Sequence, residues 1–290
     1  MHFLRSTLRA AVLAVIACSV LATAKPTVQQ VGPGLYAYIS DNDASANSTF
    51  LVGRTGVLVV DTGLNADEGA KLLGAIRQVS HLPVKFIVNT HYHPDHQGGN
   101  AAVGPDAVVI TTEFTRDRTL ALIQSPEMKG FQFRPANVTF QNQVTVYLDP
   151  YSVKVYFPGK AHTSGDALAY FPEQRVLAAG DLFLNRSSPA MDNGSAANWI
   201  QALDRALELP LEHVVPGHFE LGSKADLQRF RDYLSDLFQQ VRIMRQRGET
   251  LDQVRRNIHM GKYADFRQFP KYHATFADNA AVIYEQLQAH

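Results

Sequence analysis

Three histidines and an aspartate fall within six consecutive positions, as His91, His93, Asp95 and His96. Imidazole nitrogen and carboxylate oxygen are the side-chain atoms that bind zinc and related metals. Alternate residues of an extended segment point the same way, so His91 and His93 can bind one ion together. Pro94 disfavours a helical conformation at His93, and Asp95 and His96 then face a neighbouring position. The spacing predicts a metal site rather than a histidine-rich surface loop.

Three more candidate ligands follow downstream in short glycine-containing segments. His162 lies in PGKAHTSGD (158–166), Asp181 in AGD (179–181) and His218 in VVPGH (214–218). Each segment alone is a weak signal, because such short combinations occur by chance. In this order after the first motif, they resemble the ligand segments of the metallo-β-lactamase-fold hydrolase superfamily. The resemblance covers residues 28–220.

The resemblance implies a two-metal site. The first metal would bind His91, His93 and His162. The second would bind Asp95, His96 and His218, and Asp181 would bridge the two. Two zinc ions are the expected cofactors, with iron as the alternative because the same ligand types bind it. Asp95 is also the predicted catalytic residue, since it can orient the attacking water as well as bind metal.

Two positions depart from patterns found among the relatives. Asp181 stands where some true β-lactamases have cysteine, and in this respect the chain is similar to glyoxalase II, lactonases and related esterases. Phe219 follows the last histidine, where many relatives carry glycine. The first departure weakens a β-lactamase assignment, and the second puts the local turn in question.

Strands and helices are interspersed along most of the chain, which predicts a layered α/β domain. Alternating or continuous apolar runs predict strands, and 3.6-residue apolar spacing predicts helices. The predicted strands are 28–39, 49–60 (two strands joined at Gly53–Gly56), 84–88, 106–111, 137–140, 143–148, 152–157, 167–171, 176–179 and 213–215. The predicted helices are 66–79, 112–124, 196–209 and, apart from a loop at 260–275, most of 224–290. The resemblance implies an αββα sandwich, residues 25–223, with a helical C-terminal extension, residues 224–290, packed on it.

The N-terminal residues have the pattern of an export signal. Arg5 and Arg9 precede an apolar run, and Ala22-Thr23-Ala24 is a small-x-small cleavage pattern, so residues 1–24 are predicted to be a signal peptide. Export to the periplasm is the expectation. Cys18 is the chain's one cysteine and offers an alternative processing site at which a lipid would be attached. The apolar run is too short to be an integral membrane span.

The charge balance narrows the partners. Lys plus Arg and Asp plus Glu each total 27 in 290 residues, so no basic surplus points to nucleic acid. A small-molecule substrate is expected, and nothing in the sequence indicates an oligomeric state. Nuclease activity is disfavoured by the same absence of basic surface.

The predicted function is hydrolysis of an ester, thioester, lactone or lactam carbonyl by water activated at a dinuclear site. The alternatives are a β-lactamase proper, an iron-dependent dioxygenase of the same fold, and a periplasmic metal-binding module without catalysis. Glyoxalase II itself fits less well, since export separates the protein from cytosolic glutathione. Tyr272 and His273 are candidates for the substrate cleft, with weaker support for Tyr92 and Asn185.

Overall fold

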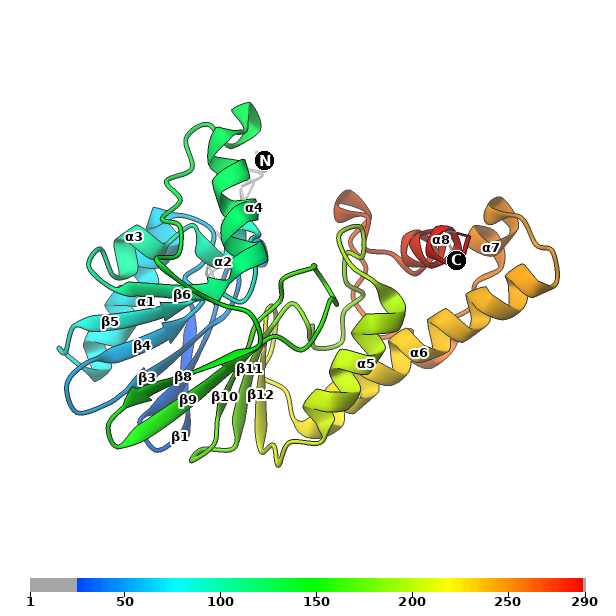
Figure 1. Ribbon diagram of the computed structural model, residues 1–290. Coiled ribbons are helices and arrows are strands. Elements are labelled where there is room, and N and C mark those ends of the chain that lie inside the picture. Colours follow the sequence, from blue (N-terminus) through cyan, green and yellow to red (C-terminus); the bar gives the residue numbers. More distant parts are fainter. Residues whose placement is uncertain (1–24, 289–290) are drawn as a thin grey trace, which may run out of the picture.

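Two β-sheets lie face to face in the computed structural model, which describes residues 25–288, and helices cover their outer faces (Figure 1). This is the αββα sandwich predicted from the sequence, and the prediction is confirmed. The predicted signal peptide, Cys18 included, lies outside the described residues. Within residues 25–288, no helix is both long and apolar enough to cross a membrane.

The first sheet has seven strands that neighbour one another in chain order. They are β1 (Thr27–Gly32), β2 (Leu35–Ile39), β3 (Ser48–Val52), β4 (Val57–Val60), β5 (Val84–Val88), β6 (Val108–Thr112) and β7 (Val138–Phe140). The strands from β1 to β4 are antiparallel, and those from β4 to β7 are parallel. Parallel strands bring their carboxyl ends to one edge of the sheet, which is where α/β proteins commonly bind ligands.

The second sheet has five strands in the order β12-β11-β10-β9-β8. They are β8 (Gln143–Leu148), β9 (Tyr151–Tyr156), β10 (Leu168–Phe171), β11 (Val176–Gly180) and β12 (His213–Pro216). The last pair, β11 and β12, is parallel, and Gly180 lies opposite Pro216. The segments that follow these two strands therefore start side by side.

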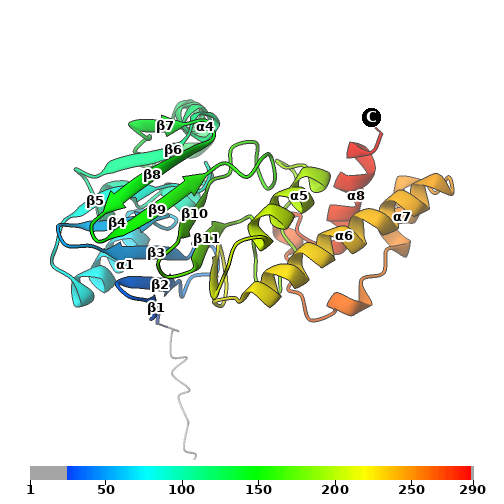
Figure 2. The same ribbon diagram turned by 60° about the horizontal axis from the view of Figure 1, so that its bottom comes forward.

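Residues 25–288 form eight α-helices. They are α1 (Ala66–Val79), α2 (Pro94–Gln97), α3 (Asn100–Val103), α4 (Glu113–Gln124), α5 (Ala196–Leu207), α6 (Lys224–Gln246), α7 (Leu251–Asn257) and α8 (Phe276–Gln286). The helix predicted over 196–209 ends two residues early, because Pro210 disfavours a helical conformation at Leu209. Figure 2 shows α5 and α6 beside the second sheet, with α7 and α8 beyond them.

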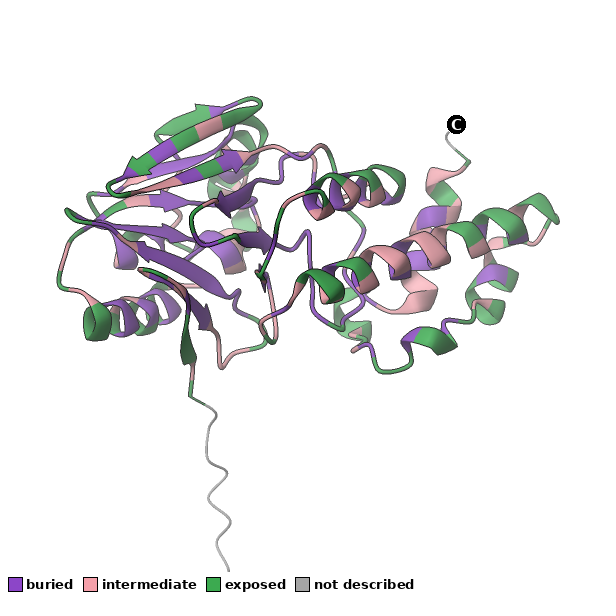
Figure 3. Cartoon of the chain, turned by 90° about the horizontal axis from the view of Figure 1, so that it is seen from below, coloured by how far each residue is buried: buried purple, intermediate pink, exposed green. Residues whose placement is uncertain are grey.

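Three apolar cores hold these layers together, and buried residues fill the centre of the molecule (Figure 3). Along β4, Leu58 and Val60 belong to the core between the sheets, while Val57 and Val59 pack towards α1. This division follows from the two-residue period of a strand. The third core joins the second sheet and α5 to α6 and α8. The C-terminal helices therefore share a core with the sandwich.

Candidate metal centre

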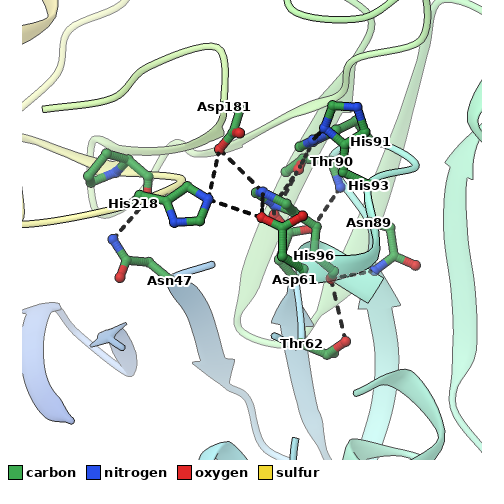
Figure 4. Close-up of polar contacts among 12 residues, drawn as sticks. Asn47, Asp61, Thr62, Asn89, Thr90, His91, His93, His96, Asp181 and His218 are labelled. Carbon is green, nitrogen blue, oxygen red and sulfur yellow. Dashed lines mark hydrogen bonds and ion pairs between the residues drawn. The ribbon is translucent and has the colours of Figure 1, made fainter. Parts of the chain in front are cut away.

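The seven predicted ligands converge where strands of both sheets end, and Figure 4 shows five of them, His91, His93, His96, Asp181 and His218. His91 lies three residues beyond β5, Asp181 directly follows β11, and His218 lies two residues beyond β12. His93 is extended, with φ −64° and ψ 143°, and Pro94 begins the short helix α2. The parallel pairing of β11 and β12 brings Asp181 beside His218, and the packing of the two sheets brings both to His91, which is 127 positions from His218 in the sequence.

One group of ligand atoms surrounds the Nδ1 atom of His93. Nε2 of His91 lies 2.9 Å from it, and Nε2 of His162 lies 3.1 Å from it. Oδ2 of Asp181 is 3.6 Å from Nε2 of His162. One atom from each of these four side chains therefore lies within 4.8 Å of the others.

A second group contains Asp95, His96, Asp181 and His218. Nε2 of His96 lies 3.3 Å from Oδ2 of Asp95 and 3.2 Å from Oδ1 of Asp181. Nε2 of His218 lies 3.1 Å and 3.6 Å from the same two oxygens. Asp181 thus faces the first group with Oδ2 and the second with Oδ1, which is the arrangement needed for a bridging carboxylate.

Asp61, which was not predicted from the sequence as a site residue, is a buried carboxylate behind the second group. Its Oδ2 lies 2.8 Å from Nδ1 of His96, and it accepts hydrogen bonds from the amide and the hydroxyl of Thr90 at 2.8 and 2.7 Å. A carboxylate on the outer nitrogen of a ligand histidine fixes its tautomer and orientation. The available signal was an acidic residue directly after the fully buried strand β4.

The turn that follows His218 forms with Phe219 at the position where many relatives carry glycine. Phe219 has a φ of 70°, a left-handed conformation that costs a residue with a Cβ atom about 1–2 kcal/mol. The side-chain amide of Asn47 donates to the carbonyl groups of Pro216 and Phe219, at 3.1 and 2.8 Å. These two bonds hold both sides of the turn and offset part of its strain.

Burial and charge set the protonation of the ligands. Burial lowers the pKa of His91 well below its usual value and that of His162 to about 3. Burial also acts to lower the pKa of His96, but the carboxylates of Asp181 and Asp95 outweigh it and raise that pKa. Burial acts to raise the pKa of Asp181, but His96 and His218 outweigh it and lower that pKa. The carboxylates are therefore ionised, as metal ligands must be.

The residues fit a pair of divalent metal ions. Five imidazoles and two carboxylates offer nitrogen and oxygen donors only, a set that suits zinc and iron. Nε2 of His96 and Oδ1 of Asp181 are buried and lie 3.2 Å apart, but neither has a partner in hydrogen-bond geometry among the described residues. A buried polar atom left without a partner costs about 1–3 kcal/mol. A bound cation would satisfy both atoms.

Of the four residues predicted as candidates for the substrate cleft, one lines the cavity. Tyr272 lines the cavity above the ligands, whereas His273 is not among the lining residues. Tyr92 is buried beneath His93, with ring centroids 4.7 Å apart. The side chain of Asn185 donates to backbone carbonyl groups of residues 220 and 221. Neither Tyr92 nor Asn185 lines the cavity.

Comparison with known proteins gives a consistent family. A family model described as the metallo-beta-lactamase superfamily matches residues 41–218. The chain is 28% identical over 222 residues to the 2,4-dinitroanisole O-demethylase subunit alpha of Nocardioides sp., covering 75% of this chain and 63% of that protein. It is 25% identical over 227 residues to the metallo-beta-lactamase type 2 of Elizabethkingia meningoseptica, covering 74% and 87%. The chain thus spans less than two thirds of the first relative.

Solved structures agree on the fold. A metallo-beta-lactamase from Pontibacter korlensis matches with a TM-score of 0.63 and 25% identity, over 72% of this chain and 99% of that one. A stereoselective inverting sec-alkylsulfatase from Pseudomonas sp. matches with a TM-score of 0.72 and 16% identity, over 90% of this chain and 50% of that one. At this identity the second match speaks for the fold alone.

Proposed function

The chain belongs to the metallo-β-lactamase superfamily, and from that premise we propose that it is an exported hydrolase that uses two zinc ions to cleave an ester, thioester, lactone or lactam. The observation that carries the proposal is Asp181, whose two oxygens face two separate groups of ligand atoms. A bridged pair of metals is the arrangement used for activating water against a carbonyl carbon.

Metal ions bound at such a site polarise a carbonyl oxygen and lower the pKa of a coordinated water to about 7. The protein's own residues position the reactants. Asp95 borders the cavity and is held by His218 and His96. Its carboxylate can accept a hydrogen bond from the attacking water and fix its direction. The apolar walls of the cavity limit competing water, which strengthens electrostatic interactions at the reacting bond.

Cleavage of an aryl alkyl ether to a phenol and an alcohol is a second candidate reaction. It is favoured by the relative named 2,4-dinitroanisole O-demethylase subunit alpha and by the aromatic side chains in the cavity, among them Phe219 and Phe269. Like ester hydrolysis, this reaction consumes one water and needs no redox partner.

The proposal is tested with the chain lacking residues 1–24, loaded with zinc in one sample and with iron in another. Phenyl acetate, S-phenyl thioacetate, a lactone, a chromogenic cephalosporin and 2,4-dinitroanisole are the substrates, each with and without a chelator. We expect a chelator-sensitive kcat/KM above about 10⁴ M⁻¹s⁻¹ for at least one carbonyl substrate with zinc.

The other outcomes select the alternatives. Turnover of dinitroanisole alone would support ether cleavage, and oxygen consumption by the iron form with a persulfide would support a dioxygenase. Tight binding of two metal ions with no turnover of any substrate would refute the enzymatic proposal in favour of a metal-binding module. Mass spectrometry of the exported protein decides between cleavage after Ala24 and a lipid on Cys18.

A further inference from the structure

The cavity above the ligands has a volume of about 630 Å³ and an aromatic side. Phe219, Phe269 and Tyr272, here called the aromatic wall, line it together with Leu64, Leu184 and Phe131. No lysine or arginine is among its lining residues within the described part of the chain, whereas the exposed Asp43 is one of them. Apart from the metal ligands, the cavity therefore offers little to an anion.

Phe219 has a strained backbone conformation at its position in the wall. Its left-handed φ of 70° is one that glycine adopts freely and phenylalanine does not. Strained residues that persist at a site point to a function for the side chain. Here the ring stacks on Phe269, with centroids 5.7 Å apart and planes 2° from parallel.

The other side of the wall comes from the C-terminal extension. Phe269 and Tyr272 lie on the loop between α7 and α8, with ring centroids 6.5 Å apart. Two backbone hydrogen bonds of 2.9 Å hold this loop against the segment that follows β11. The amide of Ser188 donates to the carbonyl of Arg267, and the amide of Arg267 donates to the carbonyl of Arg186. The wall is thus assembled from two distant parts of the chain and held in place.

Two cations lie against rings of the wall, and one of them is already paired with a carboxylate. The guanidinium of Arg267 lies 4.5 Å from the Phe219 ring centroid and forms a 2.5 Å ion pair with Glu220. The ammonium of Lys271 lies 5.5 Å from the Tyr272 ring centroid. Neither residue lines the cavity. Away from the metal centre, a substrate carboxylate in the cavity would lack the cationic side chain that a buried charge requires.

We propose that this site selects uncharged substrates that carry a flat aromatic group beside the scissile bond, and that the aromatic wall binds that group. The inference rests on the proposed hydrolysis of carbonyl substrates and names the substrate class. Aromatic rings favour offset-stacked or edge-to-face contacts with other rings, and these contacts add to the effect of burial. A saturated ring of similar size gains the burial but not the stacking.

The ratio of kcat/KM for phenyl acetate to that for cyclohexyl acetate tests the proposal. The two esters differ in intrinsic reactivity, but this difference is the same for every variant, so a change in the ratio reports on binding by the protein. The variants are Phe219→Gly, which suits the left-handed backbone, and Phe269→Leu, which keeps an apolar side chain. We expect each to lower the phenyl-to-cyclohexyl ratio of kcat/KM by roughly two- to twelve-fold. Tyr147→Ala, which removes a 79% exposed aromatic residue on β8, is the control and should leave the ratio unchanged.

Charge gives an independent measurement. The wild-type protein should cleave phenyl acetate with a higher kcat/KM than 3-carboxyphenyl acetate, which has the same ring and an added negative charge. A preference for the anionic ester would overturn the proposal, as would unchanged phenyl-to-cyclohexyl ratios in both wall variants whose circular dichroism matches the wild type.

Binding separates this proposal from the proposed reaction. If no ester is hydrolysed, the reaction is wrong, but calorimetric titration of the zinc-loaded protein with acetanilide and N-cyclohexylacetamide still tests the wall. A preference for acetanilide that Phe219→Gly abolishes supports the wall, and equal affinities refute it. If esters are cleaved but the phenyl-to-cyclohexyl ratio does not depend on the wall residues, the proposed reaction is supported and the proposed substrate class is wrong.

Discussion

Replacing Asp61 by asparagine should weaken the second metal position without disturbing the backbone. Asparagine has the same shape and, like aspartate, tolerates the φ of 56° found at this position. Its oxygen can still accept the hydrogen bond from the Thr90 amide. Its NH₂ group, however, would face Nδ1 of His96, which now lies 2.8 Å from a carboxylate oxygen. That donor would place the imidazole proton on Nε2, the nitrogen that faces Asp95 and Asp181.

Two estimates give the size of the effect. Loss of a carboxylate behind a ligand histidine typically lowers metal affinity 10- to 100-fold, which corresponds to about 1.4–2.7 kcal/mol. A hydrogen bond to a charged group contributes about 1.5–3 kcal/mol. The substitution removes one such bond, the one between the Asp61 carboxylate and His96. The estimates agree, so we expect a 10- to 100-fold weaker second zinc ion and a smaller change for the first.

The assay is a zinc titration against a chromophoric chelator, which resolves two successive dissociation constants. Asp204→Asn, which changes a carboxylate in an ion pair with Arg231 on the surface of α5, is the matched control. It should bind both ions as the wild type does. If folded Asp61→Asn protein also binds both ions with wild-type affinity, the tautomer argument is wrong.

Four further substitutions probe the site and the fold. Asp181→Ala should lose both metal ions to a chelator that leaves the wild type loaded, and full metal content with full rate by elemental analysis and kinetics would exclude a bridging role. Gly217→Ala should also lower metal content, because a Cβ atom there would overlap Oδ1 of Asp181; metal content equal to that of the wild type would contradict this contact. Gly74→Ala meets no atom within 4 Å in the interior of α1, so it should stabilise the protein by about 0.5–1 kcal/mol in urea unfolding, and destabilisation would contradict that reading. Trp199→Phe removes the 2.9 Å hydrogen bond from the indole to the Leu182 carbonyl and should cost about 1–3 kcal/mol in the same assay; a wild-type midpoint would show that the carbonyl finds another donor.

The sequence predicted what depends on local pattern. The strand at 84–88 and the helix at 66–79 have the predicted bounds, because the strand is a short apolar run that packs on both faces and the helix buries one face at 3.6-residue spacing. The crowding of His91, His93 and His96 was equally visible. Asp181 and His218 were named through resemblance to a family, since Gly-Asp and Pro-Gly-His carry little information alone.

What the sequence did not reveal depends on pairings between distant segments. Asp61 contacts His96 across 35 positions because β4 and β5 are parallel neighbours, a pairing that no local pattern specifies. Phe219 and Phe269 meet for a similar reason, through the fastening of the C-terminal loop to the segment after β11. The replacement of glycine at 219 was visible as an anomaly, but its partner was not.

The two metal positions are supported by different physical means. Asp61 fixes His96 directly and reaches His91 through the hydroxyl of Thr90, which lies 3.1 Å from Nδ1 of His91. His162 has no such support, because its Nδ1 is buried without a partner in the described part of the chain. Its ring instead packs against Trp199, with centroids 5.3 Å apart.

The orientation of the His162 ring therefore depends on packing, whereas that of the His96 ring depends on a hydrogen bond. Trp199 is fully buried, bonds to the carbonyl of Leu182 beside Asp181, and packs against Phe230 of α6 with ring centroids 6.1 Å apart. The C-terminal helices thus complete the core that orients the ligands on the second sheet. Since the loop between α7 and α8 also supplies two of the three residues of the aromatic wall, the same extension packs behind the metal ligands and lines the substrate cavity.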